Sequence, residues 1–248
     1  MNDIFPDSQI IRLPETQSTN SYLLQLSQSE KLSEGTVVVT DNQTAGRGQG
    51  NNFWESEAGA NIAFSIILYP VTVKASEQFI ISKVISLAVF DFISGIVENA
   101  AIKWPNDIYV GDEKIAGILI ENFIAGENLN RTIAGIGINI NQKHFFSDAP
   151  NPVSLYQLTG KTYLLDSCLK NILACIAERY KMISERKKLD ADYLRQLYRI
   201  GVPAYFCEEG KTFVATITGV NPLGMLELIT EDGERKICKK NTYKNRKK

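Results

Sequence analysis

The sequence predicts an α+β protein that ends in a small all-β module. Up to about residue 198, β-branched apolar runs alternate with segments that carry apolar residues at helical spacing, as in a sheet covered by helices. After Gly201 the pattern changes to short strand candidates separated by glycine-containing turns. The 248 residues are 44% hydrophobic, which is enough to bury the core of one large domain with an appendage.

The N-terminal elements follow from these apolar patterns. TVVVT at 36–40 and NIAFSIILY at 61–69 are β-branched runs typical of buried strands. Residues 18–29 predict a helix, because Ser18 or Thr19 could cap it and leucines supply one apolar face. In order, we expect a strand at 10–13, a helix at 18–29, strands at 36–40 and 61–69, a helix at 75–97, and a strand at 101–104 that Pro105 ends.

The remaining elements begin with a hairpin whose turn is Gly111-Asp112. Its arms are 107–110 and 114–123, and we expect a strand at 132–140, helices at 165–188 and 191–198, and strands at 203–207, 212–220, 225–230 and 234–238. We therefore divide the chain into domains of residues 1–198 and 199–248. The second domain is too small to be robust alone, so we expect it to dock on the first.

Charge and residue counts exclude several functional classes. The net charge of -1 offers no general attraction for nucleic acid. A histidine-rich zinc site is excluded because His144 is the only histidine. The four cysteines form no CxxC pair, and we expect buried, reduced thiols. We find no secretion signal and no apolar run long enough to span a bilayer, so a cytoplasmic protein is expected.

The stretch QTAGRGQGNNFW at 43–54 has the features of an anion site. Its three glycines let backbone amides approach a ligand closely, because no Cβ intervenes. Arg47 offers a planar fork that matches phosphate or carboxylate oxygens, and Trp54 could supply a flat face for a base. The stretch does not match the dinucleotide pattern G-x-G-x-x-G, because Asn51 stands at the third glycine. A flexible surface loop with a core tryptophan remains the alternative.

Two further polar clusters favour the ligand site over a plain loop. KWPNDIYVGDEKIAGILIEN at 103–122 sets Lys103, Asn106, Asp107 and Lys114 among strand-forming residues. GIGININ at 135–141 places asparagines on a strand whose glycines permit close ligand approach. If each of these polar residues is considered singly, a structural hydrogen bond is enough to explain it. Three clusters of this kind in one chain indicate a binding site.

Together these motifs resemble the biotin protein ligases. QTAGRGQ with a downstream tryptophan looks like the adenylate-binding loop of that family, and KWPNDIYVGDEKIAGILIE looks like its central signature. GIGININ is similar to its glycine- and asparagine-containing strand, and STN at 18–20 matches its early biotin-contact triplet. The resemblance runs from about Pro14 to Asn141 and extends more loosely to the C-terminal module.

The resemblance implies a class II aminoacyl-tRNA synthetase-like catalytic domain, with a mixed sheet and helices, followed by an SH3-like β-barrel. It implies activation of biotin with ATP to biotinyl-5′-AMP, with release of pyrophosphate, and transfer of biotin to a lysine of a biotin carboxyl carrier protein or domain, with release of AMP. Mg²⁺ is expected with the ATP. Because the similarity begins by about Pro14, we expect no N-terminal DNA-binding domain and no operator binding. A homodimer is possible in this family.

The resemblance also implies roles for individual residues. Lys114 and Arg47 are expected to be catalytic, with Lys114 at the junction of carboxylate and phosphate. Biotin contacts are expected from Ser18, Thr19, Asn20, Gln43, Arg47, Gly48, Gln49, Lys114 and Gly117. Contacts with ATP or the adenylate are expected from Arg47, Gln49, Trp54, Asn106, Asp107 and Asn139, and Asp107 could also help to place Mg²⁺.

One departure and two rival readings remain open at this level. In a familiar form of the loop more arginines follow the first, whereas here Gln49, Gly50, Asn51 and Asn52 follow Gly48. This departure puts tight retention of the adenylate in doubt. The rival readings are a lipoate–protein ligase, which does analogous acyl-adenylate chemistry, and a non-catalytic synthetase-like domain that binds RNA or protein.

Overall fold

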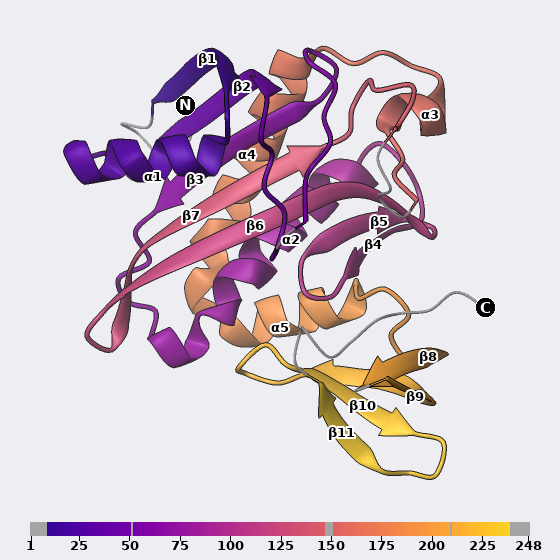
Figure 1. Cartoon of the computed structure of the whole chain (residues 1–248). Coiled ribbons are helices and arrows are strands. Elements are labelled where there is room, and N and C mark those ends of the chain that lie inside the picture. Colours follow the sequence, from indigo (N-terminus) through magenta and orange to yellow (C-terminus); the bar gives the residue numbers. More distant parts are fainter. Residues whose placement is uncertain (1–8, 51, 147–150, 209, 239–248) are drawn as a thin grey trace.

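The computed structural model describes residues 9–50, 52–146, 151–208 and 210–238, which form two sheets with helices around the larger one (Figure 1). The larger sheet has seven strands in the order β1-β2-β3-β7-β6-β5-β4. Their bounds are β1 Ile10–Thr16, β2 Val37–Gln43, β3 Ile62–Leu68, β4 Ala100–Lys103, β5 Asp107–Val110, β6 Glu113–Ala125 and β7 Asn128–Ile138. β1 and β2 pair in parallel and the other neighbours are antiparallel, so the predicted mixed sheet is confirmed.

Each face of this sheet packs into a different apolar cluster. Along β2, Val37 and Val39 pack with the larger cluster, whereas Val38 packs with Leu23 of α1 (Thr19–Ser29) on the opposite face. This alternation is the two-residue period of a strand. β3 is buried at all seven positions, which explains its nearly continuous apolar sequence.

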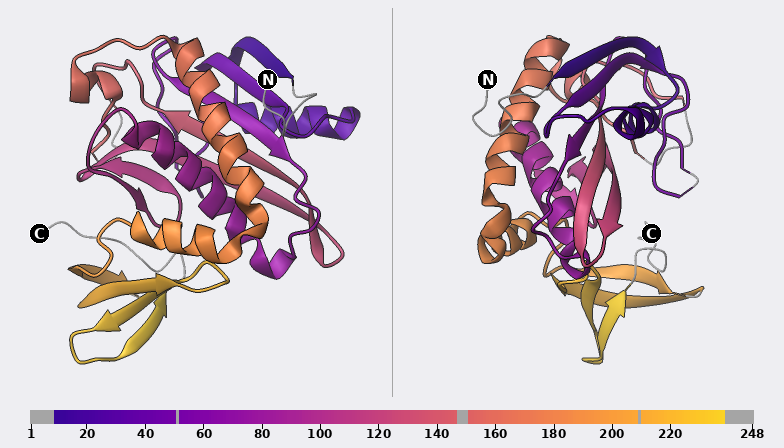
Figure 2. Two further views of the ribbon diagram at one scale, coloured as in Figure 1. Left: turned by 180° about the vertical axis from the view of Figure 1, so that it is seen from behind. Right: turned by 90° about the vertical axis from the view of Figure 1, so that its left-hand side faces the viewer.

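Helices cover the two faces unequally. Figure 2 shows α2 (Phe79–Ser94) and α4 (Leu165–Lys181) stacked on one face of the sheet, with α1 alone on the other. A 3₁₀ turn at Ala75–Glu77 precedes α2. The loop after β2 and the hairpin β6–β7 lie on the face that carries α1.

The prediction of a single helix at 165–188 is wrong. α4 ends at Lys181, a 3₁₀ turn follows at Met182–Ser184, and α5 spans Arg186–Arg195 instead of the predicted 191–198. The turn redirects the chain so that Leu189 and Tyr193 are buried against the core. A straight helix would carry both side chains past α2, and no local pattern distinguishes the two outcomes.

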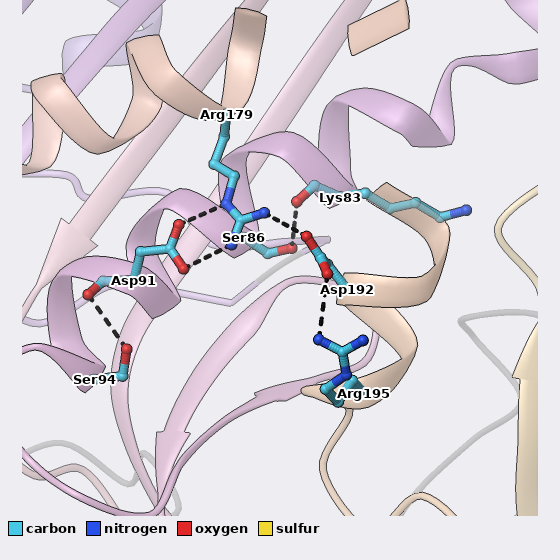
Figure 3. A network of polar contacts seen from close by, with 7 residues as sticks. All are labelled: Lys83, Ser86, Asp91, Ser94, Arg179, Asp192 and Arg195. Atoms are coloured by element: carbon cyan, nitrogen blue, oxygen red, sulfur yellow. Dashed lines mark hydrogen bonds and ion pairs between the residues drawn. The ribbon is translucent and has the colours of Figure 1, made fainter. Parts of the chain in front are cut away.

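A half-buried ion cluster joins α2, α4 and α5 (Figure 3). Arg179 of α4 donates two hydrogen bonds to Asp91 of α2, at 2.6 and 2.9 Å, and a third to Asp192 of α5 at 2.8 Å. The hydrogen bonds to Asp91 raise the pKa of Arg179 above its ordinary value. This paired geometry satisfies the guanidinium and holds α5 at its angle to α4.

A short helix that the sequence analysis did not predict, α3 at Leu155–Thr159, lies beside the end of β7. Its N-terminus is a capping box, in which Ser154 accepts from Gln157 N and Gln157 accepts from Ser154 N. Gly160 ends the helix in the left-handed conformation. The sequence S-x-x-Q before a glycine was the available signal.

The C-terminal strands form a second, four-stranded antiparallel sheet in the order β11-β10-β9-β8. The strands are β8 Pro203–Glu208, β9 Lys211–Val220, β10 Leu226–Thr230 and β11 Arg235–Cys238, as predicted to within two residues. Over the described residues this sheet is open and closes no barrel. Its buried side chains belong to the same apolar cluster as α2 and α4, so this smaller sheet is docked against those helices. None of the described helices is long and apolar enough to cross a membrane.

Candidate active site

A cavity of about 480 Å³ lies on the face of the sheet that carries α1. Its walls come from the start of α1, the loop after β2, the turn between β4 and β5, and the paired strands β6 and β7. Among the residues predicted for the site, those that line this cavity are Ser18, Thr19, Asn20, Gln43, Arg47, Gly48, Gln49, Trp54, Asn106, Asp107, Lys114 and Gly117. Residues separated by about 100 positions in the sequence are thus brought to one hollow.

Asn139 is the predicted residue that does not line the cavity. It stands just after β7 with 1% of its surface exposed, and its Nδ2 donates to Val153 O at 3.0 Å. That bond turns the side chain toward the segment that leads into α3 and away from the cavity. Its Oδ1 is buried and has no hydrogen-bond partner among the described residues.

One end of the cavity is a buried polar network at the start of α1. Gln43 Oε1 accepts from Thr19 N at 2.9 Å and from Thr19 Oγ1 at 3.2 Å, and it thereby caps the helix in place of Ser18. Ser65 Oγ lies 2.7 Å from Thr19 Oγ1 and 2.5 Å from Asn20 Oδ1. The network holds amide and hydroxyl groups, which include both hydrogen-bond donors and acceptors, in fixed positions around a small volume.

Ser65 supports this network and was not predicted. It is fully buried in β3, directly behind Thr19 and Asn20. The available signal was its position as the one hydroxyl in the apolar run IAFSIIL. A buried hydroxyl needs a partner, so a polar residue in such a strand indicates a polar contact on one face.

The middle of the cavity is positively charged. Arg47, Lys103 and Lys114 line it, against the single carboxylate of Asp107. Lys114 Nζ pairs with Asp107 Oδ2 at 2.7 Å, and Arg47 pairs with Glu121 at 2.9 Å behind the cavity wall. The excess of cations favours an anionic ligand, which can take over these contacts.

Lys103 was not assigned a role from the sequence, yet it lines the cavity. Its Nζ lies 3.0 Å from Tyr109 Oη and 4.5 Å from the centre of the Tyr109 ring. Burial lowers the pKa of Lys103 below its ordinary value, while the charge of Asp107 opposes that shift. Its place opposite Asp107 in the β4–β5 pair keeps it next to Lys114.

Trp54 covers the floor of the cavity. Gly117 of β6 and Gly137 of β7 are paired, and a Cβ at Gly137 would lie 2.5 Å from the Trp54 Nε1. A Cβ at Gly117 would lie 2.8 Å from Trp54 Cζ3, so both glycines are needed for this contact. Trp54 Nε1 is buried without a hydrogen-bond partner among the described residues. The indole therefore lies against Gly117 and Gly137, which together we call the glycine floor. The motifs of the sequence predict that biotin binds there.

The loop that carries Trp54 folds back on itself. Gly48 N donates to Asn52 O at 2.8 Å and Trp54 N donates to Gly46 O at 2.9 Å, while Arg47 and Phe53 form an isolated bridge. These bonds form a small hairpin on one side of the cavity. The hairpin contacts the sheet through Trp54 and through the ion pair of Arg47 with Glu121 in β6.

Comparison with known proteins gives one family and several close folds. A model described as "Biotin/lipoate A/B protein ligase family" matches residues 13–139. The bifunctional ligase/repressor BirA of Bacillus subtilis (strain 168) is 33% identical over 214 residues, which are 82% of this chain and 64% of BirA. The biotin--[acetyl-CoA-carboxylase] ligase of Paracoccus denitrificans is 36% identical over 132 residues, which are 52% of this chain and 53% of that protein. The chain thus spans less than two thirds of the length of these relatives.

Among solved structures, the biotin protein ligase from Aquifex aeolicus in complex with biotin and ATP superposes with a TM-score of 0.79. The sequence identity is 27%, and the match covers 97% of this chain and 99% of the other. The similarity therefore includes the C-terminal sheet as well as the seven-stranded one.

Proposed function

The chain belongs to the biotin/lipoate A/B protein ligase family, and from that premise we propose that it activates biotin with ATP and transfers it to an acceptor lysine. Biotin's carboxylate attacks the α-phosphorus of ATP, which gives biotinyl-5′-AMP and releases pyrophosphate. The lysine amine of a biotin carboxyl carrier domain then attacks the carbonyl carbon of that mixed anhydride, and AMP leaves.

The proposal rests on one observation. A wall of uncharged polar groups and a wall of cationic groups meet in a single cavity. The buried network of Thr19, Asn20 and Gln43 offers donors and acceptors that suit a ureido ring. Next to it lie Arg47 and Lys114, which suit a carboxylate and a phosphate. A lipoyl ring has no ureido group to pair with these polar groups, so this network favours biotin over lipoate.

In the first step Lys114 and Arg47 supply positive charge. We assign Lys114 to the junction of the two anions, where its ammonium offsets repulsion between carboxylate and α-phosphate and the charge that gathers in the transition state. Arg47 would exchange Glu121 for a ligand oxygen, and Lys114 would exchange Asp107. Both groups are held by carboxylates and are therefore positioned before the ligand arrives.

Mg²⁺ fits this cavity as a companion of ATP. The described residues hold no cluster of three or more histidine, cysteine, aspartate or glutamate side chains, and Asp107 is the lone carboxylate on the cavity wall. Magnesium is commonly bound by one or two carboxylates together with substrate phosphates. Asp107 would supply the protein oxygen, and the ion would neutralise phosphate charge.

We extend the proposal to partner, compartment and second domain. The acceptor is a small biotin carboxyl carrier domain of a carboxylase, and the compartment is the cytoplasm, where ATP is supplied and the four free thiols stay reduced. We assign residues 199–248, of which β8 to β11 form the smaller sheet, to an SH3-like domain and residues 1–198 to the catalytic domain. We also propose a homodimer that forms through β1, which is an end strand of the larger sheet among the described residues.

The test of the activity is isotope exchange between ATP and labelled pyrophosphate in the presence of biotin or lipoate. Exchange that depends on biotin, followed by labelling of a purified carrier domain, is the expected result. Exchange with lipoate alone would transfer the assignment to lipoate ligation. A lack of exchange with either acid would leave a binding domain without this chemistry.

We expect biotin to change the emission of Trp54. The indole lies on the glycine floor, and its Nε1 has no hydrogen-bond partner among the described residues, so a ligand there must move it into another environment. Trp104 is the only other tryptophan, and its Nε1 donates to Gly224 O at 3.0 Å, so it should respond less. The measurement is a fluorescence titration of the wild type and of Trp54→Phe. An equal response in both proteins would mean that Trp54 stays in place.

We expect Gln49→Arg to slow release of the adenylate. Gln49 lines the cavity two positions after Arg47 and offers a neutral donor where arginine would offer a charged one. A charge-assisted hydrogen bond is worth roughly 1.5–3 kcal/mol, so release should slow by about tenfold or more. The measurement is release of labelled biotinyl-AMP, together with stray labelling of bystander lysines, which should fall. An unchanged release rate would mean that position 49 does not face the phosphate.

A further inference from the structure

The turn between β4 and β5 places Asn106 in the cavity wall. Asn106 is 4% exposed and stands between Pro105 and Asp107, which line the same cavity. A peptide unit is planar, so the carbonyl group of Pro105 and the backbone nitrogen of Asn106 move as one body. The group that holds the Pro105 oxygen therefore also sets the place from which the Asn106 side chain projects.

That carbonyl oxygen is held by Tyr193 of α5. Tyr193 Oη donates to Pro105 O at 2.7 Å, although the two residues are 88 positions apart in the sequence. A carbonyl oxygen can only accept, so the phenol must be the donor. Burial raises the pKa of Tyr193 well above its ordinary value, and the hydroxyl keeps the proton that this bond needs.

The position of the Tyr193 hydroxyl is fixed by two other helices. Its ring packs edge-to-face on Phe79 of α2, with ring centres 5.8 Å apart and an angle of 87° between the planes. The neighbouring residue, Asp192, accepts a hydrogen bond from Arg179 of α4 at 2.8 Å, within the half-buried ion cluster (Figure 3). The donor is thus in place before any ligand binds.

The chain that follows α5 is also joined to β4. Ile102 N donates to Gln196 O at 2.7 Å, and Ile102 O accepts from Tyr198 N at 2.8 Å. Ile102 and Leu197 accordingly form a parallel bridge beside β4. Because α5 cannot shift along β4 without breaking these bonds, the distance between Tyr193 and the turn that carries Asn106 is fixed.

We propose that Tyr193 is a positioning residue for adenylate formation, because its hydroxyl holds the peptide that aims Asn106 at the nucleotide. The inference rests on the proposed function and adds to it a residue that does not itself line the cavity. A displacement of about 1 Å in a group that orients a substrate can cost on the order of 100-fold in rate. Loss of a single buried hydrogen bond behind Asn106 is therefore enough to affect the reaction with ATP.

The effect should be confined to the nucleotide side of the cavity. The polar network expected to contact biotin is built from Thr19, Asn20 and Gln43, and Ser65 of β3 supports it. None of its hydrogen bonds involves the turn between β4 and β5. A displaced Asn106 should thus change the use of ATP and leave the binding of biotin as it is.

The variant for the test is Tyr193→Phe, which removes one oxygen and keeps the ring on Phe79. In biotin-dependent pyrophosphate exchange, kcat/KM for ATP should fall about tenfold. The Kd for biotin, measured without ATP, should equal that of the wild type. The melting temperature should fall by about 2–4 °C, as for the loss of one hydrogen bond in a protein of this size.

The matched control is Tyr180→Phe in α4. Tyr180 is 9% exposed, and its Oη donates to Glu34 Oε1 at 2.6 Å, away from the cavity. This variant also loses a hydrogen bond from a buried phenol, so its melting temperature should fall at least as far. Its kcat/KM for ATP should nevertheless match the wild type. An equal loss of kcat/KM in both variants would show general loosening of the fold and overturn the positioning role.

A double-mutant cycle tests whether Tyr193 acts through Asn106. Asn106→Ala removes the side chain that the tyrosine is proposed to aim, so adding Tyr193→Phe to it should reduce kcat/KM for ATP by less than twofold. A tenfold loss that persists in the Asn106→Ala protein, or a Tyr193→Phe protein with wild-type kcat/KM for ATP, would overturn the inference. Absence of biotin-dependent exchange in the wild type would instead overturn the proposed function.

Discussion

Lys114→Ala should slow formation of biotinyl-AMP by roughly 100- to 1,000-fold, the usual cost of removing one preorganised electrostatic group. The ammonium lies in the cationic part of the cavity, 2.7 Å from Asp107. Without it, the carboxylate and the α-phosphate meet with no cation between them, and Asp107 adds a third negative charge. The rate should fall far more than the affinity for biotin, because the charge matters most in the transition state.

The fold should tolerate this substitution. The strand position of Lys114 is held by its backbone, since its N donates to Asn151 O at 2.7 Å and its O accepts from Val153 N at 3.0 Å. The pair with Asp107 is partly exposed on both sides and contributes little to stability. The melting temperature of Lys114→Ala should therefore stay close to that of the wild type.

Single-turnover assays of adenylate formation provide the measurement. Lys170→Ala on the exposed side of α4 is the matched control and should be as active as the wild type. Lys114→Arg keeps the charge but changes its shape and reach, so it should fall between the two. A Lys114→Ala protein that forms the adenylate at nearly the wild-type rate would remove Lys114 from the chemistry.

Gly135→Ala and Gly137→Ala should separate stability from ligand binding, although both glycines face the cavity from β7. A Cβ at Gly135 would lie 2.1 Å from Asn20 Oδ1. Asn20 cannot yield, because it is buried and bound to Ser65 and Glu121. Overpacking and a broken buried hydrogen bond together should cost about 2–4 kcal/mol and lower the melting temperature by about 5–15 °C.

At Gly137 the added methyl group meets the Trp54 indole, which belongs to the loop and can move. Gly137→Ala should therefore melt within about 3 °C of the wild type, because surface-loop shifts cost little. Its affinity for biotin should nevertheless fall, since the methyl group occupies the glycine floor. Thermal melting and biotin titration of both variants check the pair. A Gly135→Ala protein as stable as Gly137→Ala would mean that the network around Asn20 is not rigid.

The sequence by itself determined most of the elements and the content of the site. Buried strands such as β3 are visible because their apolar run is a local property, and the hairpin of β5 and β6 follows from its glycine turn. The clusters around Arg47 and Lys114 could be grouped before the structure because each motif is short and continuous. The four strands after Gly201 were found for the same reason.

Only the tertiary structure decided how distant residues meet. The helix predicted at 165–188 breaks because Tyr193 must pack on α2, and Asn139 turns away because Val153 offers it a carbonyl. Ser65 joins the site through Thr19, 46 positions away, and a cavity between α2 and the turn that joins β9 to β10 is lined by both Phe79 and Leu223. A local sequence pattern indicates whether a residue faces the core or the solvent. The contacts of that residue depend on packing between segments that are far apart in the chain. They cannot be read locally, because the folded state minimises the free energy of all those contacts together.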